Sequence, residues 1–478
     1  MPLQRYLQKD SKHLWKEGRF MDFEKLSDII KDENRIKIGT DIEDKYLSDA
    51  LNRNKGKADV LIFPINTEEV SSIMKIAYEN GIPVTPRGAG TGLVGATIPT
   101  RGGIILDLSL MKNIVELDEN TLTVTVQPGI LLVDLQKFVE SKGFFYPPDP
   151  GEKNASIGGN ISTNAGGMRA VKYGVTRDYV MGLEVVLADG TILNTGGKVI
   201  KNSSGLDIKD LIIGSEGTLA IITRAILKLI PKPKKSISAI IPFNSLKEGI
   251  DTVIKIIKKN ANPTAIEFME SDVIENAERF LKLKFPSDRG KAYLLLTFDG
   301  DEEFEIESNY KKVKEVALGN NALDFILLDK KDDIERTWKI RGALVTAVEA
   351  VSEQEPIDIV VPIDRSADFI NYTKVAEKEF GIKISSFGHA GDGNVHLCVI
   401  RNGMEENLWN EKSRKLLKAL YRKGKELNGL PSGEHGIGIN KKPYFIDVTD
   451  KINVEYMRRI KKAFDEKGIL NSGKSYSI

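Results

Sequence analysis

Three of the four histidines in this chain lie in two short glycine-rich segments, each beside an acidic or amide residue. The first segment carries His389 and His396, seven residues apart. In a single strand this spacing would put the two rings on opposite faces. Gly391 and Gly393 lie between them and let the chain turn. We therefore expect both imidazoles to reach one point.

The second segment, residues 432–438, adds a carboxylate from Glu434 and a further imidazole from His435. Two neutral imidazoles and one carboxylate form a good site for a divalent transition metal, with open positions left for a substrate. The pattern predicts that His389, His396 and Glu434 bind a metal ion. The alternative is three ordinary core or surface histidines, which the shared glycine-rich setting disfavours.

Length and composition limit the kind of protein that can position these residues. The 478 residues indicate two or three domains. With 69 Lys and Arg against 68 Asp and Glu, the formal charge of +1 argues against nucleic acid or an anionic membrane as the main partner. The one cysteine, Cys398, excludes an intrachain disulfide and a cysteine-rich zinc site and indicates a reducing compartment. We expect Cys398 to pack in the core.

The sequence shows no targeting or membrane segment. Its first thirty residues are charged throughout and predict no signal peptide. It contains no run of about 18 apolar residues, so we expect no integral membrane segment. His13, alone in this region, is expected to take no part in the chemistry. These features predict a cytoplasmic protein and leave peripheral membrane association open.

Two long glycine-rich loops are predicted, at residues 86–103 and 156–167. Residues 90–95 formally match a dinucleotide-binding fingerprint, but Pro86 is expected to interrupt the strand before it and Pro99 to prevent the helix after it. Such loops can instead point several backbone N–H groups at one anion. Because both loops join hydrophobic strands, we favour a shared phosphate-bearing ligand over two ordinary surface loops.

Helices and strands that could carry these segments follow from the hydrophobic periodicity. Residues 1–50 indicate polar helix. A βαβ unit, a half-buried strand, a helix, a hairpin and a long strand are expected, in that order, at residues 60–85, 121–126, 131–141, 183–193 and 219–230. After a charged, proline-rich boundary at 231–235, predicted strands and helices alternate as in an α+β domain with an antiparallel sheet. There we expect strands at 237–241 and 293–298 and helices at 245–259, 272–283, 301–318, 404–428 and 452–467.

Several motifs, in their order along the chain, resemble the FAD-linked oxidase superfamily related to vanillyl-alcohol oxidase. The nearest resemblance is to the branch of D-lactate dehydrogenase, glycolate oxidase and D-2-hydroxyglutarate dehydrogenase, and it runs from about Val60 to the C-terminus. The motifs are Pro86–Gly92, Pro147–Pro150, Gly158–Asn160, Asn164–Gly167, Tyr173–Gly174 and Ile213–Leu219.

The resemblance implies an α+β fold. It has a two-subdomain FAD-binding domain of the vanillyl-alcohol oxidase type and an α+β substrate (cap) domain with an antiparallel sheet. On this basis we expect four parts. They are a helical lead-in (1–54), the FAD-binding domain (55–231), the cap domain with the metal histidines (236–428) and a C-terminal segment that completes the active site (429–478).

The resemblance also implies which residues meet the flavin. Those expected to bind FAD are Pro86, Arg87, Gly88, Ala89, Gly90, Thr91, Gly92, Pro150, Ser156, Gly158, Gly159, Asn160, Ser162, Gly166, Glu216, Gly217, Ile221 and Asn471. Some distant members attach FAD covalently through histidine. No histidine lies in these loops, so we expect non-covalent FAD.

The same resemblance assigns roles around the metal. It implies zinc or manganese on the two histidines and the glutamate, with His435 as the acid/base. Arg341 matches the family's substrate arginine. An arginine suits this role because a guanidinium meets a carboxylate in two hydrogen bonds. On sequence alone an ordinary salt bridge is equally open. Relatives acting on 2-hydroxyglutarate carry a lysine near the position of Pro356, and its absence favours a monocarboxylate. Ser472 replaces a proline of the family's closing motif.

The expected activity is FAD-dependent, metal-assisted oxidation of a small D-2-hydroxy acid to the 2-oxo acid. D-lactate is the first choice of substrate, with glycolate and D-2-hydroxyglutarate left open. An external quinone, cytochrome or electron-transfer flavoprotein would accept the electrons, and a homodimer is left open. The alternatives are a flavin-binding subunit of a larger glycolate oxidase-like complex, an ether-lipid synthase-like flavoenzyme, and a nicotinamide enzyme or metal hydrolase with incidental glycine loops.

Overall fold

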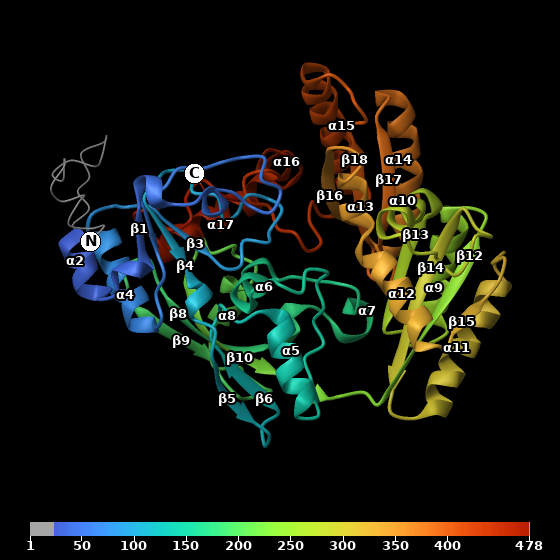
Figure 1. Ribbon diagram of the computed structural model, residues 1–478, viewed down its shortest axis with the longest axis horizontal. Coiled ribbons are helices and arrows are strands. Elements are labelled where there is room, and N and C mark those ends of the chain that lie inside the picture. The colour runs from blue at the N-terminus through green and yellow to red at the C-terminus, as the bar shows by residue number, and fades with distance from the viewer. Residues whose placement is uncertain (1–22, 478) are drawn as a thin grey trace.

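Three principal β-sheets organise the protein in the computed structural model, which describes residues 23–477 (Figure 1). The first has four strands, in the order β1-β2-β4-β3. Its strands are β1 (Ile36–Ile38), β2 (Val60–Ile62), β3 (Val84–Arg87) and β4 (Ile104–Asp107). Helix α4 (Thr67–Glu79) connects β2 to β3, and both strands run parallel to β4 between them. The Asn66 side chain caps α4 by accepting a hydrogen bond from Glu69 N at 2.8 Å.

The expectation that Pro86 interrupts the strand before the glycine loop is wrong. Pro86 lies inside β3, opposite Leu106 of β4. The strand tolerates it because β3 is the edge of the sheet, where a residue without an N–H breaks no inner ladder. Residues 88–103 then form an irregular segment without helix or strand.

The second sheet is antiparallel, with the order β5-β6-β10-β8-β9. Its strands are β5 (Ile114–Asp118), β6 (Thr123–Val126), β8 (Val180–Val186), β9 (Ile192–Gly196) and β10 (Ile221–Lys228). The β8–β9 hairpin and the long β10 agree with the prediction. Leu122 differs from its predicted place in a half-buried strand, because it turns before β6 with φ +51° and is 39% exposed. Helix α5 (Leu132–Ser141) covers this sheet with Leu132, Leu135 and Val139.

The segment 156–167, predicted as a loop, contains the helix α6 (Ile157–Thr163). Ser156 caps this helix by accepting a hydrogen bond from Gly159 N at 3.3 Å. Two glycines stand in its first turn because the turn packs closely. A Cβ on Gly158 would lie 2.6 Å from Pro128 Cβ.

The N-terminal region is only partly helical. Residues 1–22, which carry His13 and most of the segment in which no signal peptide is expected, lie outside the described residues. Of the rest, α2 (Phe23–Ile29) and the short α3 (Asp44–Leu47) are helical, but β1 is a strand that pairs with β2. Leu26, Ile36 and Ile38 are buried in the core beside α4, so this region is less polar than predicted.

The third sheet has seven antiparallel strands, in the order β15-β12-β14-β13-β17-β18-β16. Its strands are β12 (Lys235–Phe243), β13 (Ala265–Glu270), β14 (Ala292–Gly300), β15 (Ile326–Leu328), β16 (Gln354–Val360), β17 (Lys383–His389) and β18 (Asn394–Ile400). This is the α+β arrangement with an antiparallel sheet that the sequence predicts.

Helices cover both faces of this sheet. One face packs against α9 (Leu246–Lys258), α11 (Glu303–Leu318), α14 (Ser366–Phe380) and α15 (Glu406–Glu426). The other packs against α10 (Ser271–Leu281), α12 (Lys331–Gly342) and α13 (Leu344–Glu349). Cys398 is 1% exposed within this second core, as predicted.

The molecule has two parts, one that holds the first two sheets and one that holds the seven-stranded sheet, and the chain crosses between them more than once (Figure 1). The short strand β11 (Ile230–Pro231) pairs with β7 (Phe144–Phe145), and β12 then begins the seven-stranded sheet. After α15 the chain returns through α16 (Lys442–Val448) and α17 (Lys451–Phe464), and Leu470 bridges to Val84 of the first sheet. The short helices α7 (Ala170–Tyr173) and α8 (Ile208–Ile212) complete the part that precedes β12.

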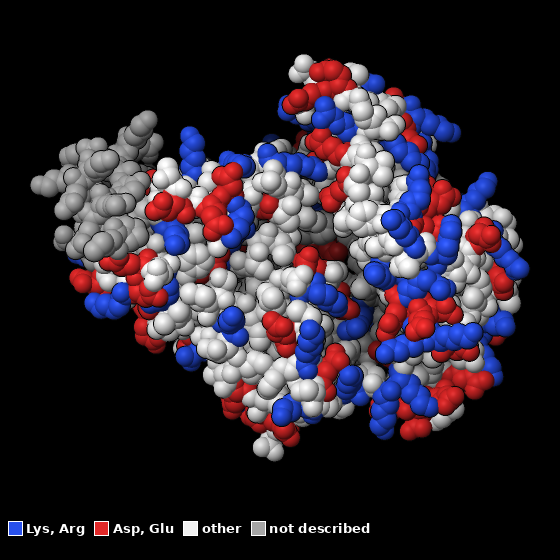
Figure 2. Space-filling view, in the orientation of Figure 1, with Lys and Arg blue, Asp and Glu red and all other residues white. Residues whose placement is uncertain are grey.

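The surface between the two parts is hollowed (Figure 2). On the face shown, basic and acidic side chains are interspersed without a large area of one sign. Among residues 23–477 no helix combines the length and the apolar composition needed to cross a bilayer.

Candidate active site

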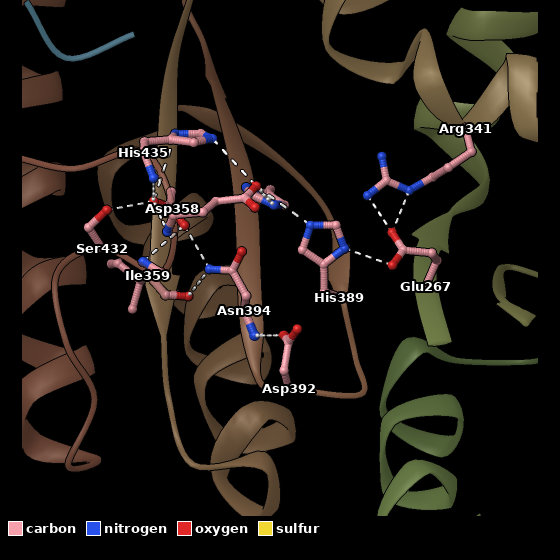
Figure 3. Close-up of polar contacts among 12 residues, drawn as sticks. Glu267, Arg341, Asp358, Ile359, His389, Asp392, Asn394, Ser432 and His435 are labelled. Atoms are coloured by element: carbon pink, nitrogen blue, oxygen red, sulfur yellow. Dashed lines mark hydrogen bonds and ion pairs between the residues drawn. The ribbon is translucent and has the colours of Figure 1, made fainter. Parts of the chain in front are cut away.

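Polar side chains of four adjacent strands gather at one end of the seven-stranded sheet (Figure 3). Glu267 of β13 lies opposite His389 of β17, and His396 of β18 lies opposite both Phe387 of β17 and Asp358 of β16. Side chains of directly opposed residues share a face of the sheet. The register of the strands therefore brings these groups together although Glu267 and His396 are 129 residues apart in sequence.

His389 and His396 lie together because β17 and β18 form a tight hairpin. The turn occupies residues 390–393, and Gly393 adopts φ +80°, a left-handed conformation that favours glycine. The ring centroids are 5.0 Å apart and the ring planes are nearly perpendicular, at 89°. The glycines between the histidines thus have the effect that the sequence predicts.

Glu434 completes a cluster of three residues that could bind a metal ion, His389, His396 and Glu434, which we call the metal-type cluster. Its Oε1 lies 3.2 Å from His396 Nε2 and 3.5 Å from His389 Nε2, and one ligand atom from each residue lies within 4.8 Å of the others. Burial alone would raise the pKa of Glu434, but the two imidazoles hold it well below its usual value. Glu434 Oε2 is buried without a hydrogen-bond partner among the described residues. An unpartnered carboxylate oxygen beside two imidazole nitrogens fits a divalent cation.

His435 lies against this cluster. Its ring stacks on His396, with centroids 5.3 Å apart and planes at 23°. Its Nε2 is 3.8 Å from Glu434 Oε1 and its Nδ1 is 3.9 Å from Asp358 Oδ2, both too long for hydrogen bonds. Burial lowers the pKa of His435 to about 4, against the effect of Asp358. The imidazole is therefore neutral near pH 7 and able to accept a proton.

Asp358 fixes the first half of the loop that carries Glu434 and His435. It is fully buried and accepts hydrogen bonds from the backbone N–H groups of residues 433–435 at 2.8 to 3.1 Å. It also accepts hydrogen bonds from the side chains of Ser432, Asn394 and Lys441. Lys441 and the hydrogen bond from Asn394 hold the pKa of Asp358 well below its usual value although burial opposes this. The carboxylate is therefore charged and fully used.

Glu216 fixes the second half of the same loop from the other part of the molecule. Its carboxylate accepts hydrogen bonds from Ile437 N at 2.8 Å, Gly438 N at 2.7 Å and Ser475 Oγ at 2.9 Å. Gly436 lies so close, with φ +84°, that a Cβ would be 3.0 Å from Glu216 Cδ. The loop therefore crosses between the two parts at residues 435–436, with a buried carboxylate holding each half.

A cavity, partly open to solvent, lies between the first two sheets and this loop. Of the residues predicted to bind FAD, most line it: Pro86, Arg87, Gly88, Ala89, Gly90, Thr91, Gly92, Ser156, Gly158, Gly159, Asn160, Ser162, Glu216, Gly217, Ile221 and Asn471. Pro150 and Gly166 are not among the lining residues. Gly166 instead faces the metal-type cluster, where a Cβ would lie 3.2 Å from Glu434 Oε2.

Two side chains of the cavity wall act as supports. The Arg87 guanidinium points away from the cavity and donates hydrogen bonds to the carbonyls of Ser48 at 2.8 Å and Lys45 at 2.7 Å. Asn471 Nδ2 donates to the Glu216 carbonyl at 2.7 Å and thereby ties the C-terminal segment to the wall.

The cavity has the features of a cofactor cradle. Six glycines stand in its wall, and a Cβ on Gly88 would lie 2.2 Å from Ser156 Oγ, so no side chain fits there. Thr97 Oγ1, also in the wall, is buried without a hydrogen-bond partner among the described residues. His435 lines the same cavity. The cavity and the metal-type cluster therefore meet at one imidazole.

Arg341, the predicted substrate arginine, forms an ion pair. Its Nε and Nη2 lie 2.8 and 2.5 Å from Glu267 Oε2 (Figure 3). This is the alternative that the sequence leaves open. The Nη1 side of the guanidinium has no protein partner among residues 23–477.

Sequence reasoning missed Glu267, Asp358 and the anchoring contacts of Glu216. The first two share a signal, because each is a single carboxylate inside an otherwise apolar strand, at residues 265–269 and 357–361. Burying a carboxylate is costly unless partners compensate it, so such a residue indicates a polar site.

Comparison with known proteins supports the resemblance. A model described as "FAD binding domain" matches residues 58–196, and one described as "FAD linked oxidases, C-terminal domain" matches residues 232–475. The chain is 43% identical over 447 residues to a D-lactate dehydrogenase of Anaerostipes hadrus, covering 92% of this chain and 94% of that one. It is 39% identical over 440 residues to a glycolate oxidase subunit GlcD of Bacillus subtilis, covering 90% and 92%.

The fold also matches solved structures. A p-cresol methylhydroxylase with substrate bound superposes with a TM-score of 0.77 at 15% identity, over 95% of this chain and 96% of that one. At this identity the likeness concerns the fold alone.

Proposed function

Because the chain belongs to the family of FAD-linked oxidases, in the branch of D-lactate dehydrogenases and glycolate oxidases, we propose that it oxidises a small D-2-hydroxy acid, D-lactate foremost. The product would be the 2-oxo acid. Glycolate is the second choice of substrate. The family assignment makes the chain an FAD-linked oxidoreductase acting on a CH–OH group.

One observation carries the proposal. His435 lines the glycine-rich cavity and also stacks on His396 of the metal-type cluster. A substrate carbon held between the two would lie beside both an electron acceptor and a base. Neither an isolated metal site nor an isolated flavin site would need this shared imidazole.

The residues present fit both groups. The cavity wall would hold FAD without a covalent bond, and His389, His396 and Glu434 would hold zinc or manganese. When bound, the flavin supplies the hydride acceptor and the divalent ion supplies Lewis-acid polarisation of the substrate hydroxyl.

The protein's own residues then bind the substrate and move its proton. The free edge of Arg341 orients the substrate carboxylate. His435 Nε2, the nitrogen on the Glu434 side, accepts the hydroxyl proton. Asp358 Oδ2, 3.9 Å from His435 Nδ1, stabilises the resulting imidazolium. The buried setting keeps these charges in a low dielectric, where each interaction is stronger than in water.

The strand β16 supports a substrate with one carboxylate. Pro356 lies opposite Cys398, so the position where relatives acting on 2-hydroxyglutarate carry a lysine offers no cation here. This favours D-lactate or glycolate over D-2-hydroxyglutarate.

The name of the Bacillus subtilis relative favours a second possibility, a flavin-binding subunit within a larger complex with its own electron acceptor. The two proposals differ in whether the isolated chain reduces its flavin with a 2-hydroxy acid.

His435→Gln tests the shared imidazole. The variant should retain flavin at the wild-type ratio while anaerobic flavin reduction by D-lactate slows by roughly 100- to 10,000-fold, the usual contribution of a positioned base. Leu430→Ala, on an exposed side chain just before the loop, should reduce its flavin at the wild-type rate. A near wild-type rate in His435→Gln would exclude the role.

A further inference from the structure

A single buried carboxylate joins the two ends of the candidate active site. Glu267 is 0% exposed and lies between Arg341 and His389 (Figure 3). Its Oε2 accepts a hydrogen bond from Arg341 Nε at 2.8 Å and forms an ion pair with Arg341 Nη2 at 2.5 Å. Its Oε1 lies 2.7 Å from His389 Nδ1. Both carboxylate oxygens are therefore used, each on a different side of the site.

The fold gives Glu267 this position through strand register. On β13 it lies between Ile266 and Phe268, and it is directly opposite His389 on β17. Helix α12 brings Arg341 over the same face. An ion pair in such a place is weak evidence for stability, because an apolar pair of similar volume would commonly serve as well. The arrangement therefore points to function.

Toward the metal-type cluster, Glu267 fixes which nitrogen His389 presents. With Nδ1–H donated to the carboxylate, the lone pair of Nε2 remains for the side of Glu434, whose Oε1 is 3.5 Å away. Histidine ligands of metals are commonly oriented by such a carboxylate, which also raises their basicity.

Toward the substrate, Glu267 occupies one edge of the Arg341 guanidinium and leaves the other for a single carboxylate. The guanidinium also lies over the Phe387 ring, with 5.2 Å to the centroid, and Phe387 stacks on His396 at 5.5 Å. Arg341 is thus fixed relative to both histidines.

We propose that Glu267 is a positioning residue that sets the metal-facing tautomer of His389 and the substrate-facing edge of Arg341 together. This inference rests on the proposed function. It implies that removing the carboxylate weakens metal binding even without substrate, and that substrate affinity falls in the same variant because Arg341 loses its orientation.

The direct test measures zinc affinity of the purified holoenzyme by chelator competition, without substrate. Glu267→Gln should raise the zinc Kd by roughly 10- to 100-fold and leave the flavin-to-protein ratio unchanged. It should also raise KM for D-lactate. Because this variant leaves Arg341 buried without its partner, the double variant Glu267→Gln/Arg341→Met is compared with Arg341→Met. These two variants differ only in the Glu267 carboxylate, so the double variant should show the same rise in zinc Kd relative to Arg341→Met.

Glu270→Gln is the matched control, because Glu270 ends the same strand and pairs with Lys374 away from the cluster. It should bind zinc like the wild type. A zinc Kd that is unchanged in both Glu267 comparisons would overturn the role of Glu267 while leaving the proposed function intact. A wild-type protein that binds neither zinc nor manganese would overturn the proposed metal site itself.

Discussion

Asp358 Oδ2 lies 2.8 Å from the backbone nitrogen of His435, so a buried carboxylate of one strand fixes the main chain of the residue that we assign as the base. The same oxygen lies 3.1 Å from Glu434 N. The metal-type carboxylate and the base therefore share one anchor in the seven-stranded sheet. Their spacing is a property of the sheet and only secondarily of the loop.

Asp358→Asn should therefore affect both stability and chemistry. An amide accepts fewer of these hydrogen bonds and leaves Lys441, which is buried, without its anion. We expect a loss of about 3–5 kcal/mol in the free energy of unfolding, the usual cost of breaking a buried pair. Urea unfolding measures this. The exposed Asp364→Asn should stay within about 0.5 kcal/mol of the wild type, and an equally small change in Asp358→Asn would contradict the anchor.

Glu216→Gln tests the second anchor. The variant loses charge-assisted hydrogen bonds to Ile437 N and Gly438 N, each worth about 1.5–3 kcal/mol. Because the Glu216 carboxylate accepts its hydrogen bonds from the loop, we expect flavin to be retained while kcat per bound flavin falls at least tenfold. Absorbance spectra and steady-state rates measure both quantities. Loss of flavin with an unchanged kcat per flavin would show that Glu216 serves the cofactor instead.

Gly88→Ala should lower the flavin content of the purified protein. A Cβ there would displace Ser156 Oγ, which caps α6 and accepts a hydrogen bond from Ala89 N at 3.3 Å. The wall of the cavity would shift as a consequence. Gly151→Ala is the control, because a Cβ at Gly151 meets no atom within 4 Å. Equal flavin-to-protein ratios in the two variants would contradict the close packing of this wall.

Lys474 predicts a pH dependence of stability. Burial lowers its pKa to about 7, whereas an unfolded lysine titrates near 10.4. Between these values the unfolded chain binds a proton that the folded chain does not, so stability rises with pH, by at most about 1.4 kcal/mol per pH unit. The difference in unfolding free energy between wild type and Lys474→Met should grow in favour of the wild type from pH 7 to 9. A fall across this window would contradict the assignment.

The chemical segments of the site could be predicted from sequence because their signals are local. Gly391 and Gly393 between two histidines indicate a turn whatever surrounds them. The glycines of residues 86–103 and 156–167 likewise indicate segments that can bind a ligand through their backbone. Most helices of the seven-stranded part could be predicted from their periodicity for the same reason.

The remaining features depend on partners that are distant in sequence. Pro86 fits a strand only because β3 is an edge, and strand order is not a local property. Glu267 and Asp358 acquire their partners through register between β13, β17, β18 and β16. The ion pair of Arg341 likewise required the position of Glu267, so sequence alone left its role divided between substrate binding and structure.

The most direct test of the central claim is anaerobic flavin bleaching by the purified chain with a panel of D- and L-2-hydroxy acids, before and after metal removal with a chelator. We predict rapid bleaching by D-lactate, weaker bleaching by glycolate and little by the L-isomer. Chelation should abolish the reaction, and zinc or manganese should restore it. Retained flavin that no 2-hydroxy acid reduces, or bleaching that chelation leaves unchanged, would contradict the account.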